Sequence, residues 1–172
     1  MDLNLRAQKI KLAIFDVDGV LTDGQIYISN EGIESKMFNV QDGLGLKLLQ
    51  KCGIQIAIIS GLESKAVSMR LQNLGVTHIY QGIKDKLAVY EELLKKTNMV
   101  NEQVAYLGDD LLDLPLMRRV GVAVAVANAR SIVKETAHWC TETKGGYGAV
   151  REFCDWLLQA QNNWQKAISF YE

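Results

Sequence analysis

The sequence has little of the material on which several classes of protein depend. It contains three cysteines and one proline in 172 residues. Cys52, Cys140 and Cys154 are odd in number, widely separated and without a CxxC pair, so they predict reduced thiols rather than a disulfide framework or a zinc site. The single proline and the lack of low-complexity tracts predict one compact domain over residues 1–172.

An excess of charge of one sign is also missing. The formal net charge is −1 and acidic and basic residues are mixed along the chain, so no basic surface for nucleic acid or an anionic membrane is predicted. No apolar run approaches the length of a membrane span, and the N-terminal MDLNLRAQK lacks the apolar stretch of a secretory signal. We therefore expect no nucleic-acid partner, no membrane partner and a cytoplasmic location.

The sequence does contain a buried-strand pattern that ends in acids. Residues 10–15 are apolar apart from one lysine, which is typical of a buried strand in a parallel sheet, and Asp16 and Asp18 follow at once. In an extended backbone these side chains leave the same edge of the strand and converge. Converging carboxylates repel each other unless a cation neutralises them, and Mg2+ is the natural candidate, which indicates phosphoryl chemistry. A lone Asp-x-Asp is more often a turn or a helix cap, so this interpretation depends on the rest of the chain.

Two further apolar runs also end in polar residues. Residues 54–59 precede Ser60-Gly61, and residues 104–107 precede Gly108 and the acids Asp109, Asp110 and Asp113. Each run is followed by a predicted helix, so right-handed crossovers would bring the carboxyl ends of all three strands together, where open α/β sheets bind ligands. Alone, Ser-Gly is equally an ordinary turn, and Asp113 could be the N-cap of a helix that has Pro115 in its first turn. Two more carboxylates beside Asp16 and Asp18 would be strongly unfavourable without a metal.

A lysine occupies an unusual place in the pattern. Lys86 lies at the N-terminus of a helix predicted over residues 87–96. An exposed cation there opposes the helix dipole at a cost of about 0.3 to 1 kcal/mol. An anionic ligand would explain its position, and a solvated surface lysine, like Lys84 and Lys95, is the alternative.

Two segments are expected to lie outside the helices and strands of the sheet. Residues 25–29 and 33–38 are β-rich and flank a turn, which predicts a protruding hairpin within residues 24–39. It carries more apolar residues than a lone ribbon exposes, so we expect it to pack on something, for example another subunit; they are Ile26, Ile28, Ile33, Met37 and Phe38. The C-terminal segment 143–172 opens with a glycine-rich stretch, predicted as a plain mobile loop, before a helix over 149–161. Another helix is predicted over 44–52, ended by Gly53.

In this order the motifs DVDGV, SG, Lys86 and GDDLLD resemble the haloacid dehalogenase superfamily of phosphatases. More narrowly, DVDGVLTDG, FNVQDG, IYQG, VAYLGDDLLDLPLM and GGYGAVRE are similar to the 3-deoxy-D-manno-octulosonate 8-phosphate phosphatases, from about residue 11 to 161. The resemblance implies an α/β fold: a Rossmann-like three-layer sandwich with a central parallel sheet, a small β-hairpin insertion and no large cap domain. It further implies a homotetramer assembled through the hairpin, a sugar phosphate substrate and a place in lipopolysaccharide biosynthesis.

The resemblance also implies roles for individual residues. Asp16 would be the nucleophile that forms an aspartyl-phosphate, and Asp18 would protonate the leaving sugar oxygen and then take a proton from water. Mg2+ would be bound by Asp16, the backbone carbonyl of Asp18 and Asp109. Ser60 and Lys86 would hold phosphoryl oxygens, while Asp110 and Asp113 would order metal-bound waters and Lys86. The substrate would contact Asp18, Asn39, Val40, Gln41, Asp42, Gly43, Lys47, Arg70 and Lys86.

The match departs from the family where many members carry arginine. Gln41, Leu62 and Tyr147 replace arginines, and Lys47 stands where one member has arginine. Loss of guanidinium groups weakens bidentate recognition of a substrate carboxylate, so a nine-carbon keto-deoxy sugar phosphate of the sialic acid type is an alternative substrate. A non-catalytic assembly module and a response-regulator receiver are alternatives from other classes. Receivers lack the second acid that Asp18 supplies here.

Overall fold

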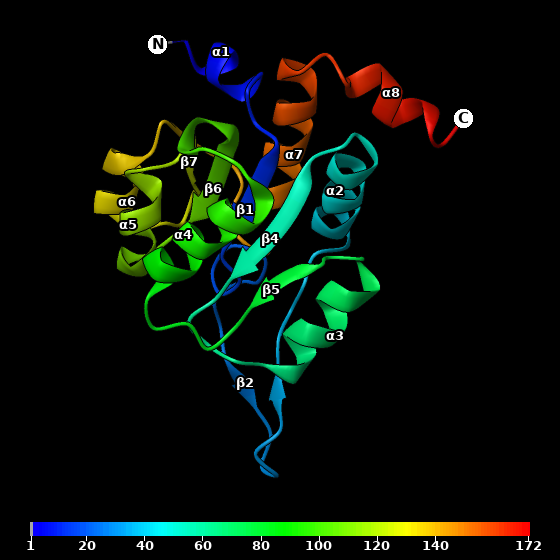
Figure 1. The fold of residues 1–172 in the computed structure, drawn as a ribbon. Coiled ribbons are helices and arrows are strands. Elements are labelled where there is room, and N and C mark those ends of the chain that lie inside the picture. The colour runs from blue at the N-terminus through cyan, green and yellow to red at the C-terminus, as the bar shows by residue number, and fades with distance from the viewer. Residues whose placement is uncertain (1) are drawn as a thin grey trace.

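A computed structural model describes residues 2–172 and places one parallel sheet at the centre of the fold (Figure 1). The sheet has six strands in the order β5-β4-β1-β6-β7-β8, and every neighbouring pair is parallel. The strands are β1 (Leu12–Phe15), β4 (Gln55–Ile59), β5 (His78–Tyr80), β6 (Val104–Gly108), β7 (Val122–Ala125) and β8 (Trp139–Cys140). The predicted α/β fold with a central parallel sheet is confirmed.

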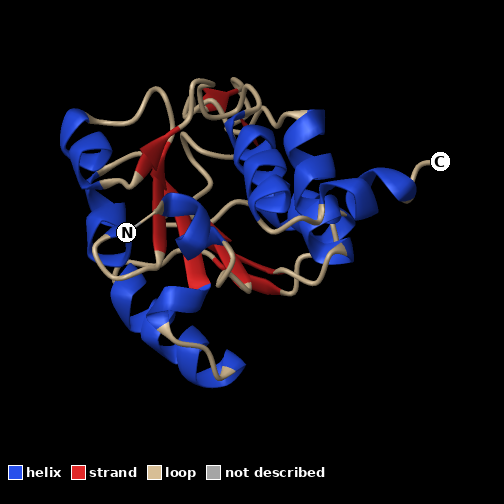
Figure 2. Ribbon diagram, turned by 90° about the horizontal axis from the view of Figure 1, so that it is seen from above, coloured by secondary structure: helices blue, strands red, loops and turns tan. Residues whose placement is uncertain are grey.

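Helices cover both faces of the sheet and make the expected three layers (Figures 1 and 2). One face carries α2 (Val40–Lys51) and α7 (Ala149–Ala160), packed against each other, with α1 (Leu3–Ala7) and α8 (Trp164–Ser169) against α7. The other face carries α4 (Lys86–Thr97), α5 (Leu114–Met117) and α6 (Ser131–Thr136). The helix α3 (Lys65–Asn73) brings Arg70 over the first turn of α2. None of the helices within residues 2–172 is both long enough and apolar enough to cross a membrane.

The core lies where the apolar runs predicted it. All four residues of β1 are fully buried. From α7, the apolar stripe that includes Val150, Phe153 and Leu157 is also fully buried, as its helical spacing predicts. Phe153 packs edge-on against Phe15, with ring centroids 5.7 Å apart at 78°. Because burial of one such side chain stabilises the fold by about 1.5 to 3 kcal/mol, α7 is an integral part of the core.

Several predicted boundaries and assignments were wrong. The helix α2 begins at Val40 rather than Leu44, because the side-chain oxygen of Asn39 accepts hydrogen bonds from the backbone N–H groups of Gln41 at 2.7 Å and Asp42 at 3.4 Å and caps the first turn. Strand β8 and helices α1 and α8 were missed because two, five and six residues are too few to show a period.

The hairpin is present, though its strands are shorter than predicted. Strands β2 (Tyr27–Ile28) and β3 (Glu34–Ser35) pair antiparallel and extend beyond the carboxyl end of the sheet (Figure 1). An isolated bridge between Thr22 and Phe38 closes its base. Ile28 is 69% exposed and Ile33 64%, so this chain alone does not cover the apolar surface of the hairpin.

The glycine-rich stretch before α7 has no helix or strand, as predicted for a loop, and it is packed against the rest of the chain. The backbone N–H of Gly146 donates to the carbonyl of Val20 at 2.9 Å, and that of Gly145 donates to Asn128 Oδ1 at 2.8 Å. A Cβ on Gly145 would overlap the carbonyl of Gly19. The two glycines therefore let this segment lie directly on the loop that follows β1.

Candidate active site

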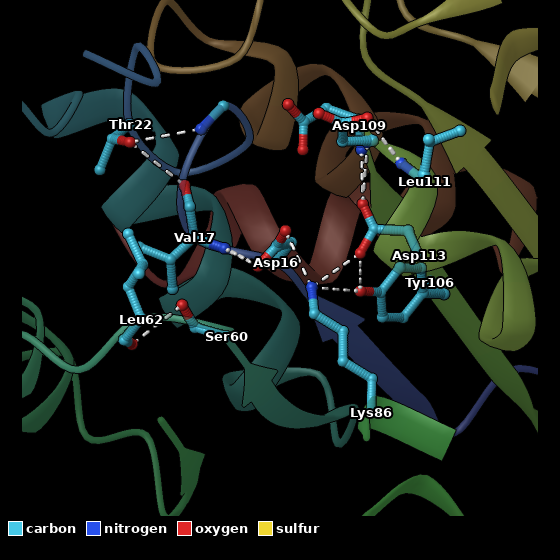
Figure 3. A network of polar contacts seen from close by, with 12 residues as sticks. Asp16, Val17, Thr22, Ser60, Leu62, Lys86, Tyr106, Asp109, Leu111 and Asp113 are labelled. Atoms are coloured by element: carbon cyan, nitrogen blue, oxygen red, sulfur yellow. Dashed lines mark hydrogen bonds and ion pairs between the residues drawn. The ribbon is translucent and has the colours of Figure 1, made fainter. Parts of the chain in front are cut away.

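Three strands deliver polar residues to one place, at the carboxyl end of the sheet (Figure 3). Strand β1 lies between β4 and β6, and the chain order reverses there, which is the usual ligand position in open α/β sheets. Asp16 follows β1, Ser60 follows β4 and Asp109 follows β6. A cavity of about 270 Å3 opens at this point, lined by Asp16, Asp18, Gly24, Gly61, Leu62, Lys86, Asp109, Asp110 and Leu112.

The carboxylate of Asp16 is held from two sides. Its Oδ1 accepts a hydrogen bond from the backbone N–H of Val17 at 2.7 Å, and its Oδ2 lies 2.9 Å from the ammonium of Lys86. The residue is 8% exposed and lines the cavity. An anion in this cavity would therefore meet a carboxylate of fixed orientation with a cation beside it.

Lys86 is buried and not a surface lysine. Its ammonium lies 2.7 Å from Asp113 Oδ1 and 3.3 Å from the hydroxyl of Tyr106, besides its contact with Asp16, and the residue is 4% exposed. Asp85 caps α4, because its side chain accepts from the backbone N–H groups of the first turn and so offsets a cation at that end. Burial alone would lower the pKa of Lys86, but Asp16 and Asp113 outweigh it and the pKa is raised. Lys86 therefore stays charged.

Asp113 ties the network together, and its side chain does not cap α5. Its Oδ1 accepts from the hydroxyl of Tyr106 at 2.6 Å and from Lys86, and its Oδ2 accepts from the backbone N–H groups of Asp109 at 2.8 Å and Asp110 at 3.2 Å (Figure 3). Asp113 does occupy the N-cap position of α5, as predicted, but its side chain makes no capping bond to that helix. Sequence reasoning missed Tyr106 because it lies inside the apolar run of β6.

The acids of the site fit a dication. One ligand atom each from Asp16, Asp109 and Asp113 lies within 4.8 Å of the others. Each carboxylate oxygen of Asp113 already accepts two hydrogen bonds. The carboxylate of Asp109 accepts none within residues 2–172. A Cβ on Gly19 would overlap this carboxylate, and Gly19 has φ of +85°, so the glycine makes room for it. Asp16 and Asp109 are therefore the better metal ligands.

The electrostatics of the site point the same way. Burial raises the pKa of Asp109 to about 8, and the nearby charges of Asp113, Asp16 and Asp110 act in the same direction. Burial also raises the pKa of Asp16 to about 7, and Asp113 adds to this, while Lys86 lowers it. Both shifts arise first from burial and then from negative charge that one lysine does not neutralise. A bound dication would favour the ionised form of both carboxylates.

Comparison with known proteins agrees with this geometry. Residues 51–153 match a family described as haloacid dehalogenase-like hydrolase. A curated relative, the 3-deoxy-D-manno-octulosonate 8-phosphate phosphatase of Yersinia pestis, is 50% identical over 166 residues, covering 96% of this chain and 89% of that protein. The chain belongs to the haloacid dehalogenase-like hydrolases, in the family of the 3-deoxy-D-manno-octulosonate 8-phosphate phosphatases.

Solved structures of other phosphatases in this family share the fold. A crystal structure of the Yersinia pestis phosphatase aligns with a TM-score of 0.93 at 50% identity, covering 95% of this chain and 88% of that one. The Moraxella catarrhalis phosphatase, solved with a magnesium ion, a phosphate ion and a KDO molecule, aligns with a TM-score of 0.95 at 44% identity, covering 98% of this chain and 97% of that one. The predicted family and its phosphatase class are confirmed.

Ser60 lies at the end of β4, as predicted for this phosphatase family, but its hydroxyl is engaged. The residue is 1% exposed, and its Oγ donates to the carbonyl of Leu62 at 3.3 Å (Figure 3). Ser60 itself does not line the cavity, although Gly61 and Leu62 do. To hold a phosphoryl oxygen the hydroxyl would have to rotate away from Leu62, so its role stays a prediction.

Asp18 lines the cavity and has a partner that sequence reasoning missed. Its Oδ1 contacts the ammonium of Lys36, which follows strand β3 of the hairpin. Asp110, by contrast, is exposed and uses its Oδ1 to accept from the backbone N–H of Leu111 at 2.7 Å. A signal for Lys36 was available in the sequence. Lys36 lies two residues before Phe38, which packs against the core, so both side chains leave the same face of the predicted strand.

The residues expected to contact the sugar lie outside the cavity in a single chain. The cavity lining includes none of Asn39, Val40, Gln41, Asp42, Gly43, Lys47 and Arg70. Asn39 caps α2, while Val40, Gln41 and Lys47 are exposed. Gly43 is buried beneath the guanidinium of Arg70, which a Cβ at that position would displace. Their contact with substrate therefore stays a prediction about the assembled protein.

Among the residues predicted to contact the sugar, Asp42 lies furthest from that expectation because it is buried. It is 1% exposed, and its Oδ1 accepts from the backbone N–H of Arg151 at 2.8 Å, so it caps the N-terminus of α7 from a neighbouring helix. Its Oδ2 has no partner within residues 2–172. Burial raises the pKa of Asp42 to about 6, against the lowering effect of the α7 backbone N–H groups. In this chain Asp42 joins two helices, and its contact with the sugar stays a prediction.

Proposed function

We propose that this protein is a Mg2+-dependent phosphomonoesterase that hydrolyses 3-deoxy-D-manno-octulosonate 8-phosphate to the free sugar acid and phosphate. One observation carries the proposal: the buried carboxylate of Asp16 lies in the cavity with its Oδ2 2.9 Å from Lys86, next to the carboxylate of Asp109, which has no partner within residues 2–172. The relatives named above support the choice of substrate. Such a reaction belongs to lipopolysaccharide biosynthesis.

The first half of the reaction transfers the phosphoryl group to Asp16. A carboxylate oxygen of Asp16 attacks phosphorus while the bond between phosphorus and the sugar oxygen breaks. Asp18, which lines the same cavity, gives a proton to the leaving sugar oxygen. The ammonium of Lys86 lies where it would contact phosphoryl oxygens and stabilise the charge that develops on them.

The second half releases phosphate. Asp18, now ionised, takes a proton from a water molecule as the water oxygen attacks the aspartyl-phosphate. The bond between phosphorus and Asp16 breaks, so the Asp16 carboxylate is restored and inorganic phosphate is released. Asp113 and Tyr106 keep Lys86 in place throughout, because their hydrogen bonds lie behind the ammonium in a buried network.

Mg2+ would be held by the side chains of Asp16 and Asp109 and the backbone carbonyl of Asp18. The carbonyl of Asp18 accepts no hydrogen bond within residues 2–172, so it is available to a cation. Asp110 lines the cavity and would order metal-bound water from outside this set. When bound, the ion neutralises the carboxylates and draws charge from the phosphoryl oxygens. Ser60 would hold a phosphoryl oxygen after rotation of its hydroxyl.

We also propose a cytoplasmic homotetramer assembled through the β2-β3 hairpin. The exposed apolar residues of the hairpin and the three free cysteines support this. Assembly would also explain why Lys47 and Arg70, expected to contact the sugar, lie outside the cavity of their own chain. These residues would then face the substrate of a neighbouring subunit.

The first test is phosphate release with Mg2+ from a panel that includes the eight- and nine-carbon keto-deoxy sugar phosphates. We expect a strong preference for the eight-carbon acid, abolished by Asp16→Asn and retained by Asp155→Asn, a half-buried residue of α7 that does not line the cavity. Preference for the nine-carbon acid would instead agree with the absence of arginine at Leu62, which lines the cavity. No turnover by the wild type would favour the assembly-module alternative.

A further inference from the structure

The side chain of Lys36 is buried although the residue lies on a protruding hairpin and is half-buried as a whole. Its side chain is 1% exposed, whereas Ile33 in the same hairpin is 64% exposed. The ammonium contacts Asp18 Oδ1 and lies 3.7 Å from Glu34 Oε1. A buried lysine is strongly destabilising unless it is paired, so this position is specified by its partners and is not an accident of a flexible surface side chain.

The base of the hairpin directs Lys36 toward the active site. Phe38, two residues further on, forms an isolated bridge with Thr22 of the loop that follows β1. Thr22 is fully buried, and its Oγ1 donates to the carbonyl of Val17 at 3.3 Å and accepts from the N–H of Gly24 at 3.3 Å. Because side chains alternate along a strand, Lys36 and Phe38 point inward while Met37, 38% exposed, points outward.

Lys36 is also the one side chain within residues 2–172 that holds the carboxylate of Asp18. Lys86 pairs with Asp16 and Asp113 and makes no ion pair with Asp18. The contact with Lys36 uses Oδ1 of Asp18 and leaves Oδ2 without a hydrogen bond within residues 2–172. Asp18 lines the catalytic cavity but Lys36 does not, so Lys36 reaches the cavity only through Asp18.

We propose that Lys36 is a positioning residue that orients the Asp18 carboxylate for proton transfer. The hairpin is then part of the catalytic apparatus as well as a candidate contact between subunits. This inference rests on the proposed function, since it concerns the two proton transfers assigned to Asp18: to the sugar oxygen as its bond to phosphorus breaks, and from water as the aspartyl-phosphate is hydrolysed. A direct phosphate-binding role does not fit, because Lys36 is absent from the cavity lining, whereas Lys86 is part of it.

Two substrates separate these roles. The sugar phosphate has an alkoxide leaving group that needs a proton, whereas p-nitrophenyl phosphate has a leaving group that departs without one. We would compare wild type, Lys36→Met, Lys36→Arg and the exposed control Lys95→Met from α4, using pre-steady-state kinetics. For Lys36→Met we expect kcat for the sugar phosphate to fall by about 10²-fold with KM nearly unchanged, since positioned proton transfer contributes about that much or more.

With p-nitrophenyl phosphate, Lys36→Met should keep a fast burst of p-nitrophenolate at the wild-type rate. A slowed steady state should follow, because hydrolysis of the aspartyl-phosphate still needs Asp18. Lys36→Arg should recover part of the loss, and Lys95→Met should behave as wild type. Size-exclusion chromatography and thermal unfolding of each variant would confirm that fold and assembly are retained.

Other outcomes would overturn the inference. An equal loss of the burst rate and of sugar phosphate turnover would mean that Lys36 supports the cavity as a whole. A raised KM with unchanged kcat would make it a binding residue, and unchanged kinetics would make it dispensable. A wild-type protein that hydrolyses neither substrate would instead defeat the proposed function itself, which keeps the two failures distinguishable.

Discussion

The carboxyl end of the sheet and the first turn of α2 were both expected to contact substrate, but the structure treats them differently. At the sheet, Asp16, Lys86 and Asp113 are buried, and each has at least two partners within the chain. At α2, Val40 is 80% exposed and Asp42 is turned into the interior. A single chain therefore brings together the groups proposed for phosphoryl transfer, whereas the groups predicted for sugar recognition remain separate from them.

Of the changes considered, removal of Lys86 should have the largest effect on activity and stability. Lys86→Met leaves the buried carboxylates of Asp16 and Asp113 without their cation, so we expect phosphatase activity to be lost and unfolding to be about 3 kcal/mol easier. Urea unfolding and phosphate release measure the two effects, with Lys95→Met as the matched control. An unfolding free energy equal to that of the wild type would show that the network at the sheet is not a stabilising unit.

Charged substitutions on the hairpin should weaken binding of the sugar phosphate more than they slow phosphoryl transfer. Ile28→Asp together with Ile33→Asp places carboxylates on the exposed apolar face, which should dissociate the proposed tetramer. If assembly completes the sugar site, KM for the sugar phosphate should rise by about 10-fold or more, the effect of losing one charged hydrogen bond. p-Nitrophenyl phosphate turnover should change little. Light scattering with kinetics checks this, and a tetramer that survives would place the interface elsewhere.

The metal should stabilise the sheet end more strongly as pH rises. The pKa values of Asp16 and Asp109, about 7 and about 8 in the folded protein, exceed the ordinary value of 3.8, so the folded state binds more protons than the unfolded state. Without metal, stability should fall as pH rises through these values, because both carboxylates must ionise while buried. Mg2+ replaces those protons, so its thermal shift should be larger at pH 8.5 than at pH 6.

Asp109→Asn tests whether Asp109 binds the Mg2+ that causes the thermal shift. This variant should lose most of the Mg2+-dependent shift at both pH values, because a carboxylate that the chain leaves free for the ion is gone. An equal thermal shift in the variant and the wild type would show that Mg2+ does not bind at Asp109.

The smallest effect is expected at Asp42. Its folded pKa of about 6 lies above the ordinary value of 3.8, so its contribution to stability is present below pH 3.8 and is lost as pH rises through 6. Asp42→Asn removes this titration, so between pH 4 and pH 7 the stability difference between variant and wild type should shift in favour of the variant by on the order of 1 to 3 kcal/mol. Denaturant unfolding at several pH values measures it. A large rise in KM without this change in stability would return Asp42 to the sugar site.

The predictions that succeeded from sequence concern local patterns. Residues 54–59, apolar apart from Gln55, and residues 104–107 were recognised as buried strands because apolar runs need no knowledge of their neighbours. Lys86 stood out because a cation at a helix start is locally unfavourable. Tyr106 and Lys36 were missed because each gains its meaning from a partner far along the chain: Tyr106 from Lys86, Lys36 from Asp18.

From the residues alone, the strands that end in acids and the family of the chain could be recognised, because apolar runs and adjacent carboxylates are local patterns. Which polar groups meet became visible only in the folded chain. The fold pairs Asp113 with Lys86, places Asp42 at the start of α7, and brings Lys36 of the hairpin to Asp18. The physical reason is that a buried charge must find a partner, and the partners available to it depend on how distant segments pack.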